Sequence, residues 1–354
     1  MRAYARCRFS LFVLALMLVF PAARVSGIEK CTVCHGRKNL SRTEETGKTV
    51  SLYVDTMQIR TSVHAKHECT DCHVDIVDIP HRHPKKVNCR RCHYAGNTVG
   101  APQGDLYDRY AQSVHGKEVA KGNPKAPVCQ DCHGTHHVLS PDSVGSTMYK
   151  TNRPRTCGKC HIDIYATYRE SIHGQALAKG VLDAPDCSGC HGEHDIKKPE
   201  DTTSSVSPEH IAETCGKCHG PKGVAAKYGI KPDRTKTYEH SFHGVAQTLE
   251  YRTVANCASC HGYHDIRPES DPRSRINPAN IVKTCGQPQC HPEATPQFAS
   301  GKIHVDPTKK ESGLVYYITK FFTILTVSVL AGLFVFILLD LYRRAKAARA
   351  NRRG

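Results

Sequence analysis

Residues 113–136 read SVHGKEVAKGNPKAPVCQDCHGTH. This stretch opens with Ser-x-His-Gly, reaches a Cys-x-x-Cys-His motif fourteen residues after His115, and continues at once into Gly-x-His. The same arrangement, with the same offset, starts again at Ser171 and at Ser241. A further cysteine motif begins twenty-one residues after His136, and both other copies keep that spacing. Fixed offsets of this kind indicate one structural module that is used three times.

Nine cysteine motifs, numbered 1 to 9 in chain order, are the strongest chemical signal in the sequence. They use eighteen of the nineteen cysteines, and in each a histidine follows the second cysteine. Eight have the form Cys-x-x-Cys-His, while motif 9 carries four residues between its cysteines. The cysteine pairs are Cys31 and Cys34, Cys69 and Cys72, Cys89 and Cys92, Cys129 and Cys132, Cys157 and Cys160, Cys187 and Cys190, Cys215 and Cys218, Cys257 and Cys260, and Cys285 and Cys290. The motif histidines are His35, His73, His93, His133, His161, His191, His219, His261 and His291.

This spacing is the attachment signature of c-type haem. Two thiols three residues apart reach the two vinyl groups of one porphyrin, and the next side chain turns under the iron as its first axial ligand. Cys-x-x-Cys pairs also bind zinc, but a zinc knuckle requires no histidine at that one position. The sequence therefore predicts nine haems c, and motif 9 is interpreted as a stretched form of the same site.

A second set of histidines stands in fixed register with the motifs and predicts the other axial ligands. In the three modules these distal histidines are His115, His136, His173, His194, His243 and His264. An abbreviated module adds His64 and either His81 or His83, and His304 follows motif 9. Nine distal histidines would give every iron two imidazoles. The sequence does not say which distal histidine serves which motif, and His67, His137, His210 and His240 remain as alternatives.

Two apolar segments predict export and anchoring. Residues 1–27 combine early arginines, an apolar run and a small-residue cleavage site, which is typical of a secretory signal peptide. Residues 314–340 predict a transmembrane helix, because Phe321 to Leu339 contain no charged residue. The basic tail 341–354 indicates a cytoplasmic C-terminus. We therefore expect a single-pass protein of the bacterial inner membrane with its haem domain in the periplasm.

The predicted haem domain comprises a three-haem region, residues 28–100, and three two-haem modules in residues 101–313. It contains no tryptophan and only two phenylalanines, Phe242 and Phe298, so its side chains alone would make a poor core. We expect a mainly α fold with extensive irregular loops, a multihaem cytochrome c fold built around stacked haems. Residues 105–122 and 163–180 each predict one helix with an Asp N-cap, a Gly stop and a distal histidine inside.

The net charge of +16 does not indicate nucleic-acid binding. Much of it lies in residues 1–27 and 314–354, which leaves +6 on the predicted haem domain. The negative charges of the haem propionates would offset this positive charge by forming ion pairs with Lys and Arg side chains. Basic residues are therefore interpreted first as propionate ligands, and a nucleic-acid partner is not expected.

Over residues 60–305 the chain resembles the multihaem c-type cytochromes of anaerobically respiring bacteria, whose motifs also read Ser-x-His-Gly, Cys-x-x-Cys-His-Gly-x-His and Cys-Gly-x-Cys-His. Its anchored layout is similar to quinol-dehydrogenase cytochromes, whose anchor is N-terminal, and to cytochrome subunits of menaquinol oxidoreductase complexes. The resemblance implies electron transfer from the quinol pool to periplasmic redox proteins. One helix cannot easily build a quinone pocket, so an integral-membrane quinol-oxidising partner is expected. Motif 9, nearest the helix in sequence, is the expected point at which electrons arrive.

The alternative function is a multihaem reductase or oxidase acting on nitrite, hydroxylamine or a sulfur oxyanion. Such an enzyme needs one haem without a distal ligand and acid or base groups above it. The histidine count is sufficient to close every site, and no Cys-x-x-Cys-Lys variant marks one motif as different. A redox sensor would need a larger output domain than a fourteen-residue tail. Electron transfer rather than catalysis is therefore the favoured interpretation.

Overall fold

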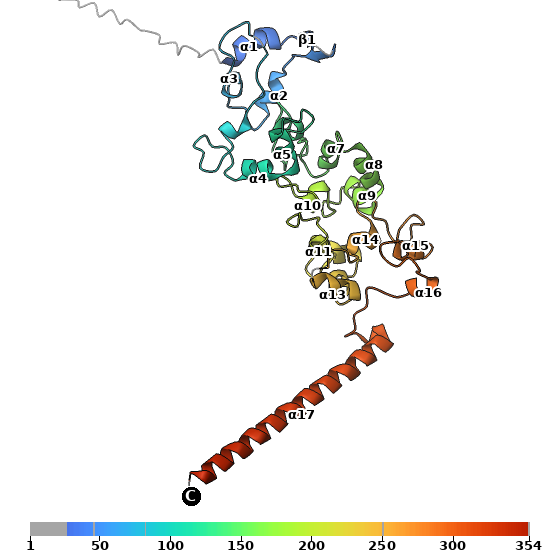
Figure 1. The fold of residues 1–354 in the computed structure, drawn as a ribbon. Helices are drawn as coiled ribbons and strands as arrows, with labels where there is room; N and C mark the ends of the chain where they lie inside the picture. The colour runs from blue at the N-terminus through green and yellow to red at the C-terminus, as the bar shows by residue number, and fades with distance from the viewer. Residues whose placement is uncertain (1–26, 45–46, 82, 250, 353–354) are drawn as a thin grey trace, which may run out of the picture. The chain divides into compact units, whose positions relative to one another are not determined.

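The computed structural model describes residues 27–44, 47–81, 83–249 and 251–352 (Figure 1). Within these ranges the regular elements are short helices, one long C-terminal helix and one two-stranded sheet, in agreement with the predicted mainly α class. The predicted signal segment 1–27 and Cys7 lie outside the described residues, except for Gly27. The chain divides into two units, the first formed by residues 1–91 with 135–139 and the second by residues 92–134 with 140–354.

The first unit holds motifs 1 and 2 and a small hairpin. Its strands pair antiparallel, with Arg42 opposite Val50. Its elements are α1 (Gly27–His35), β1 (Ser41–Thr43), β2 (Thr49–Ser51), α2 (Thr56–Arg60), α3 (Cys69–Cys72) and the 3-10 helix η1 (Cys89–Arg91). Loops therefore make up much of this unit.

The second unit contains the C-terminal helix and the three modules, apart from residues 135–139 of the first module, which belong to the first unit. The modules are built from helices of four to nine residues joined by turns. Its elements are α4 (Leu106–Gln112), α5 (Val114–Ala120), α6 (Cys129–His133), α7 (Arg153–Cys157), α8 (Ile162–Glu170), α9 (Ile172–Ala178), α10 (Cys187–His191), α11 (Ile211–His219), η2 (Val224–Tyr228), α12 (Arg234–Glu239), α13 (Phe242–Thr248), α14 (Cys257–His261), α15 (Ile281–Cys285), α16 (Pro296–Ala299), η3 (Lys310–Ser312) and α17 (Leu314–Asn351).

The side chains of the described residues bury little apolar surface. Six apolar residues are buried among them, namely Leu177, Ala184, Ile211, Ala225, Tyr238 and Ala258. The largest fully buried side chains are the serines Ser113, Ser171 and Ser207. A domain of this length normally rests on a larger apolar core, so the packing of its own side chains does not account for its stability.

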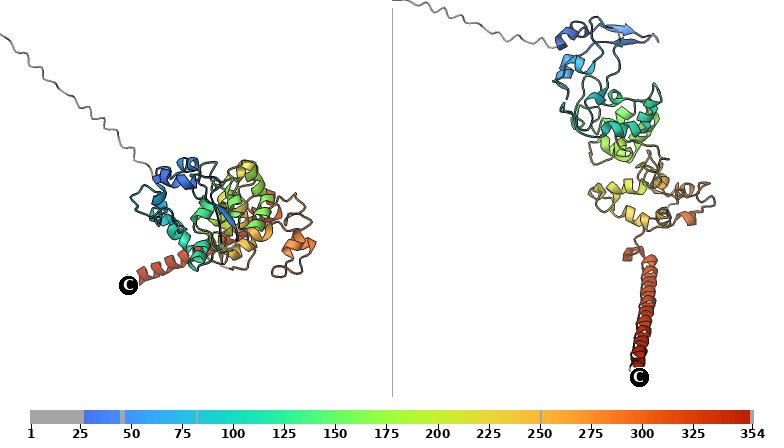
Figure 2. Two further views of the ribbon diagram at one scale, coloured as in Figure 1. Left: turned by 90° about the horizontal axis from the view of Figure 1, so that it is seen from above. Right: turned by 60° about the vertical axis from the view of Figure 1, so that its left-hand side comes forward.

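Helix α17 is long and apolar enough to cross a membrane, and none of the residues in its most apolar stretch is buried in the described structure. Figure 2 shows it as one unbroken helix. Its 38 residues correspond to about 57 Å at 1.5 Å per residue, more than the roughly 30 Å of a bilayer core. The helix continues past the predicted boundary at residue 340 to Asn351. Asp340 is neutralised there by ion pairs with Arg343 and Arg344, at 3.2 and 2.6 Å.

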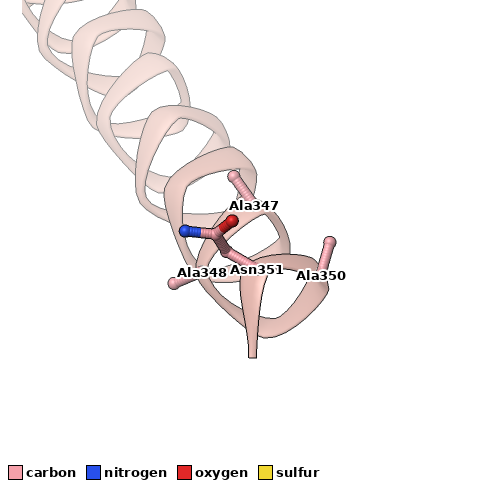
Figure 3. A pocket seen from close by; sticks show the side chains of 4 residues that line it. All are labelled: Ala347, Ala348, Ala350 and Asn351. Carbon is pink, nitrogen blue, oxygen red and sulfur yellow. The ribbon is translucent and has the colours of Figure 1, made fainter. Parts of the chain in front are cut away.

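A hollow beside the last turns of α17 is lined by Ala347, Ala348, Ala350 and Asn351 (Figure 3). All four belong to one helix, and three of them carry only a methyl group. The hollow results from short side chains on a helix surface and contains no group that could perform chemistry.

Candidate functional site

The first cysteine motif of each module forms its own five-residue helix, α6, α10 or α14. The N-cap side chain caps the start of α10 and of α14; Asp186 Oδ1, for example, accepts a hydrogen bond from the Gly189 backbone N–H at 3.0 Å. A glycine with φ between +78° and +88° ends each helix directly after the motif histidine. That left-handed conformation strains any other residue, which explains the glycine of the Cys-x-x-Cys-His-Gly pattern.

The motif cysteines lie at or near the surface of the described structure, and none of the eighteen is joined in a disulfide. Among the second cysteines of the motifs, Cys34, Cys72, Cys160 and Cys290 are exposed, whereas Cys92 and Cys218 are half-buried. The other motif cysteines are half-buried as well. Thiols that are neither oxidised nor deeply buried can react with a group brought from outside, as covalent attachment would require.

The stretched motif 9 keeps the contact between its histidine and its first cysteine. In motifs 2 and 5 the backbone N–H of His73 and of His161 donates to the carbonyl of the first cysteine, at 2.9 and 3.1 Å. In motif 9 the His291 N–H donates to the Cys285 carbonyl, also at 3.1 Å. A turn that includes the bond from Cys290 N–H to Gln287 O accommodates the two extra residues.

The Ser-x-His-Gly elements begin separate helices, so the single helices predicted over 105–122 and 163–180 are wrong. In the first module the chain breaks at Ser113, between α4 and α5. Ser113 Oγ accepts from the Gly116 N–H at 3.0 Å and donates to Tyr110 O at 2.6 Å. A Cβ on Gly116 would lie 2.0 Å from that same carbonyl. Serine and glycine are thus required to fold the first turn of α5, which carries His115, back onto the end of α4.

The same break occurs in the other two modules. Ser171 Oγ accepts from Gly174 N–H at 3.1 Å and Ser241 Oγ from Gly244 N–H at 3.2 Å. Each distal histidine of this class is therefore the second residue of a short capped helix rather than part of a long one.

A tyrosine five residues before that histidine connects its helix to the cysteine motif. The hydroxyl of Tyr110 donates to Pro127 O at 2.6 Å, and that of Tyr168 donates to Pro185 O at 2.7 Å. Both acceptors lie two residues before a first cysteine. The sequence interpretation missed this role, although the repeated Tyr at that position was its signal.

A threonine directly before the first cysteine of the second motif is a further residue that the sequence interpretation missed. Thr156, Thr214 and Thr284 donate from Oγ1 to the carbonyl nine residues earlier, at 2.6 to 2.7 Å. Each bond fixes the loop that leads into the motif. The repeated Thr-Cys-Gly triplet was the available signal.

Eight motif histidines each lie beside a second histidine that the repeat had singled out. The distances between their ring centroids fall between 5.8 and 6.3 Å. The pairs are His35 and His81, His73 and His136, His133 and His194, His161 and His115, His191 and His264, His219 and His173, His261 and His304, and His291 and His243.

The pairs obey two rules. A Ser-x-His-Gly histidine lies beside the second motif of its own module, as His115 does beside His161. A Gly-x-His histidine lies beside the first motif of the preceding module, as His194 does beside His133. His304 completes the last module by lying beside His261 rather than beside His291. The second rule means that adjacent modules build these sites together.

The pair separation fits two imidazoles on one metal ion. Imidazole–metal bonds are about 2.0–2.1 Å, and each ring centroid lies roughly 1.1 Å behind its nitrogen, so opposed ligands would have centroids about 6.3 Å apart. A close ring pair is not by itself diagnostic, because His64 and His67, neither of them a motif histidine, lie 6.0 Å apart. The eight pairs differ in that each joins a motif histidine to a histidine from a distant part of the chain.

Burial keeps most of these rings neutral. It lowers the pKa of twelve paired histidines, to about 4 for His173 and His261. A neutral ring offers a nitrogen lone pair to a metal. The ring of His35 has its tautomer set, because Nδ1 lies 2.8 Å from Leu52 O and must donate there, which leaves Nε2 free to accept.

The structure also places other candidate histidines. Of His81 and His83, the structure places His81 beside a motif histidine, His35. His64 occupies the same position in the abbreviated module as His115 does in the first. His67 faces Asp71, and His210 faces Glu213, both at 3.3 Å.

Successive motifs are adjacent in the second unit. Helix α7, which ends at Cys157, contacts the motif helix α10, and helix α11, which contains Cys215, contacts the motif helix α14, so motif 5 lies beside motif 6 and motif 7 beside motif 8. Burial first, and then the nearby Cys157, raises the pKa of the Cys132 thiol to about 11.

The cysteines of motifs 6 and 7, and those of motifs 8 and 9, also lie close enough to affect one another's pKa. Burial followed by Cys215 raises the pKa of Cys190 to about 11, and burial followed by Cys285 raises that of Cys260. Motifs 4 to 9 therefore succeed one another in space in their sequence order.

In the described residues, no three or more His, Cys, Asp or Glu side chains come together in a group that could hold a metal ion. The recurrent arrangement is the histidine pair with two cysteines nearby. No protein-family model, curated protein or solved structure matches this chain.

Proposed function

We propose that this protein is a membrane-anchored nonahaem cytochrome c that carries electrons from the quinol pool to acceptors in the periplasm. The observation that supports it most is the set of eight histidine pairs, at the separation that two axial ligands require. Each pair contains the histidine of a cysteine motif, so the covalent and axial attachments of one haem would converge at each site.

At each site, the cysteines and the two histidines would have different roles in holding the haem. The two cysteines would attach the haem covalently, the motif histidine would bind the iron on one side, and the distal histidine would bind it on the other. A haem held by two imidazoles supplies a one-electron centre without a free coordination position. The low apolar burial also supports this proposal, because porphyrins would supply the surface that side chains do not.

The adjacency of motifs 4 to 9 supports a conducting role. The contacts of α7 with α10 and of α11 with α14 leave no room for a thick layer of protein between these neighbouring sites. An electron could therefore pass along the second unit from one site to the next.

The last module is the proposed place at which electrons arrive, because it is tied to the base of α17. His304 Nδ1 lies 3.0 Å from Thr237 Oγ1, and Lys309 Nζ lies 2.9 Å from Asp233 Oδ2. These contacts attach the linker before α17 to helix α12. His304, in this linker, lies beside His261 of motif 8. Motif 8 is therefore connected to the linker in space, as motif 9 is in sequence. A membrane partner that oxidises quinol would deliver electrons to this module.

The decisive experiment is a haem count on purified protein together with low-temperature EPR and carbon monoxide binding to the reduced form. We expect nine covalent haems, all low-spin, and no carbon monoxide adduct. A high-spin haem that binds carbon monoxide would favour a reductase or oxidase instead. Protein without covalently bound haem would refute the proposal altogether.

A further inference from the structure

A recurrent backbone hydrogen bond joins each of the first two modules to the module that follows it. The residue between the serine and the histidine of a Ser-x-His-Gly element donates its N–H to the carbonyl two residues after the next Gly-x-His histidine. Val114 donates in this way to Ile196 O at 2.9 Å, and Ile172 donates to Ile266 O at 2.8 Å. The start of α5 and the start of α9 are therefore contact points between modules.

The start of α13, in the last module, lacks this contact. Phe242 holds the position of Ile172, but among the described residues no backbone carbonyl accepts a hydrogen bond from its N–H. The linker before α17 places His304 beside motif 8, while the carbonyl two residues later, that of Asp306, accepts from the Lys309 N–H at 3.1 Å. The Phe242 side chain is 85% exposed, compared with 43% for Ile172.

The exposed side of α13 is apolar along its whole length. Val245 and Leu249 lie one and two turns after Phe242, on the same side of the helix, and the three side chains are 49%, 66% and 85% exposed in that order. Tyr251, whose N–H donates to Ala246 O at 3.3 Å, is 63% exposed beside them. We call Phe242, Val245, Leu249 and Tyr251 the α13 face.

The other two modules carry polar residues where the α13 face has Val245 and Leu249. These residues are Lys117 and Lys121 in the first module and Gln175 and Lys179 in the second, and all four are exposed. The module therefore folds with polar side chains at these positions, and its fold does not require the apolar ones. A cluster of exposed apolar residues is typical of a contact with something outside the chain.

Contacts with the linker hold this module close to the start of α17. The ion pair of Lys309 with Asp233 attaches the linker to the beginning of α12. Helix α12 packs against α13, and the Tyr238 hydroxyl donates to Gln247 Oε1 at 2.7 Å between them. Leu314 begins α17 only five residues after Lys309, a separation of at most about 18 Å. The α13 face thus lies in the part of the haem domain that is attached next to the membrane helix.

We propose that the α13 face rests on the lipid surface of the membrane that α17 crosses. The inference rests on the membrane anchoring in the proposed function but not on electron transfer. Aromatic residues are favoured where lipid meets water, and Tyr316 and Tyr317 occupy the first turn of α17. The Phe242 N–H would meet the phosphate and ester oxygens of the headgroups. This contact would limit how far the last module can tilt about its linker.

The size of the α13 face favours lipid over a protein as its occupant. A stable protein interface buries about 800 Å² on each partner, which is more than four side chains supply. A contact with lipid does not need that area, because α17 already keeps the chain at the membrane and makes the contact intramolecular in effect.

The test is photochemical cross-linking of the full-length holo-protein in phosphatidylcholine vesicles. The photoreactive residue p-benzoylphenylalanine replaces Phe242, and mass spectrometry identifies what it captures on illumination. We expect a phospholipid adduct at residue 242. The same probe at Lys117, an exposed position of α5 equivalent to Val245, should give no lipid adduct.

A second variant copies the polar residues of α9. Val245→Gln/Leu249→Lys should lower the yield of the lipid adduct at residue 242 several-fold, because the apolar contact is lost. Both side chains are exposed, so the haem content and the melting temperature should stay unchanged. An adduct yield that stays the same in this variant would contradict the role of the α13 face.

The probe at residue 242 distinguishes lipid from the other occupants. Capture of a second copy of the chain, or of its own chain alone, would overturn the inference. Illumination of membranes from the producing cells repeats the test with other proteins present, and capture of such a protein in place of lipid would overturn it too. A full haem count without a lipid adduct refutes this inference but leaves electron transfer intact. Protein that does not float with the vesicles would refute the anchoring, and the inference with it.

Discussion

The ring of His304 lies 6.2 Å from that of His261, although His291 is the motif histidine nearest to it in sequence. His291 instead lies 6.2 Å from His243. The segment that leads into α17 therefore completes the first site of the last module, not the second. Nearness in the sequence therefore does not predict which motif histidine His304 lies beside. The pairing of His304 with His261 can be tested directly.

Replacing His304 by alanine should open the site of motif 8. We expect one haem to become high-spin and to bind carbon monoxide after reduction, because the distal ligand that we propose for it would be lost. His240→Ala, which changes a histidine outside the eight pairs, should give no adduct.

The assignment of His304 to motif 8 can be checked by removing one motif at a time. The adduct should disappear when Cys257 and Cys260 are also changed to serine, and it should persist when Cys285 and Cys290 are changed instead. The opposite result would assign His304 to motif 9.

Gly174→Ala should destabilise the second module. The new Cβ would lie 2.1 Å from Tyr168 O, and overpacking of this kind costs about 1–3 kcal/mol. The melting temperature of the holo-protein should fall, and part of the haem population should become high-spin as His173 is displaced. Gly104→Ala is the matched control, since its nearest neighbour would be Leu106 Cγ at 3.6 Å. Equal melting temperatures for both variants would contradict the close approach.

Tyr168→Phe should cost about 1 kcal/mol of folding free energy. It removes the hydrogen bond to Pro185 O that joins helix α8 to motif 6 and leaves that carbonyl without this donor. Chemical denaturation of the holo-protein measures the loss. Tyr251→Phe, at a tyrosine that is 63% exposed, should be neutral.

A chain produced without haem attachment should not fold cooperatively. Six buried apolar residues among those described cannot offset the conformational entropy of some 280 ordered residues. Circular dichroism on heating should show no sharp transition for the apo-chain and a sharp one for the holo-protein. A sharp transition in the apo-chain would show that the side chains suffice.

The orientation of α17 can be tested with an epitope tag after Gly354. The basic residues that come after the apolar segment predict that the tag lies in the cytoplasm. Protease added to spheroplasts should then leave the tag intact while it digests the haem domain. Loss of the tag in intact spheroplasts would reverse the predicted topology.

The repeat predicted which histidines belong to the candidate sites, but not which distal histidine lies beside which motif histidine. All six histidines at repeated positions, together with His81 and His304, lie beside motif histidines. The sequence did not predict the pairing, because a fixed offset specifies position within a module. At half of the sites in the modules, the second histidine comes from the next module or from the linker before α17. His194, for example, is only three residues from His191 but lies beside His133.

The prediction of single helices over residues 105–122 and 163–180 was wrong for a local reason. Their apolar and polar pattern continues through Ser113 and Ser171, so periodicity alone does not detect the break. The serine hydroxyl, which accepts from one helix and donates to the previous one, ends α4 and begins α5 within a single residue. A serine N-cap is a recognised start signal, but only the carbonyl beside Gly116 shows why the chain must turn there.

The pairing of histidines from different modules imposes an order on the completion of the proposed sites during biosynthesis. A polypeptide is made from its N-terminus, so His133 exists before His194, and His191 before His264. The first site of each module therefore lacks its second histidine until the ribosome has produced the next module or the linker before α17. The last such site waits for His304, ten residues before Leu314. Its completion thus coincides with the arrival of the segment that would halt translocation, and a chain cut short at any module would end in an unfinished site.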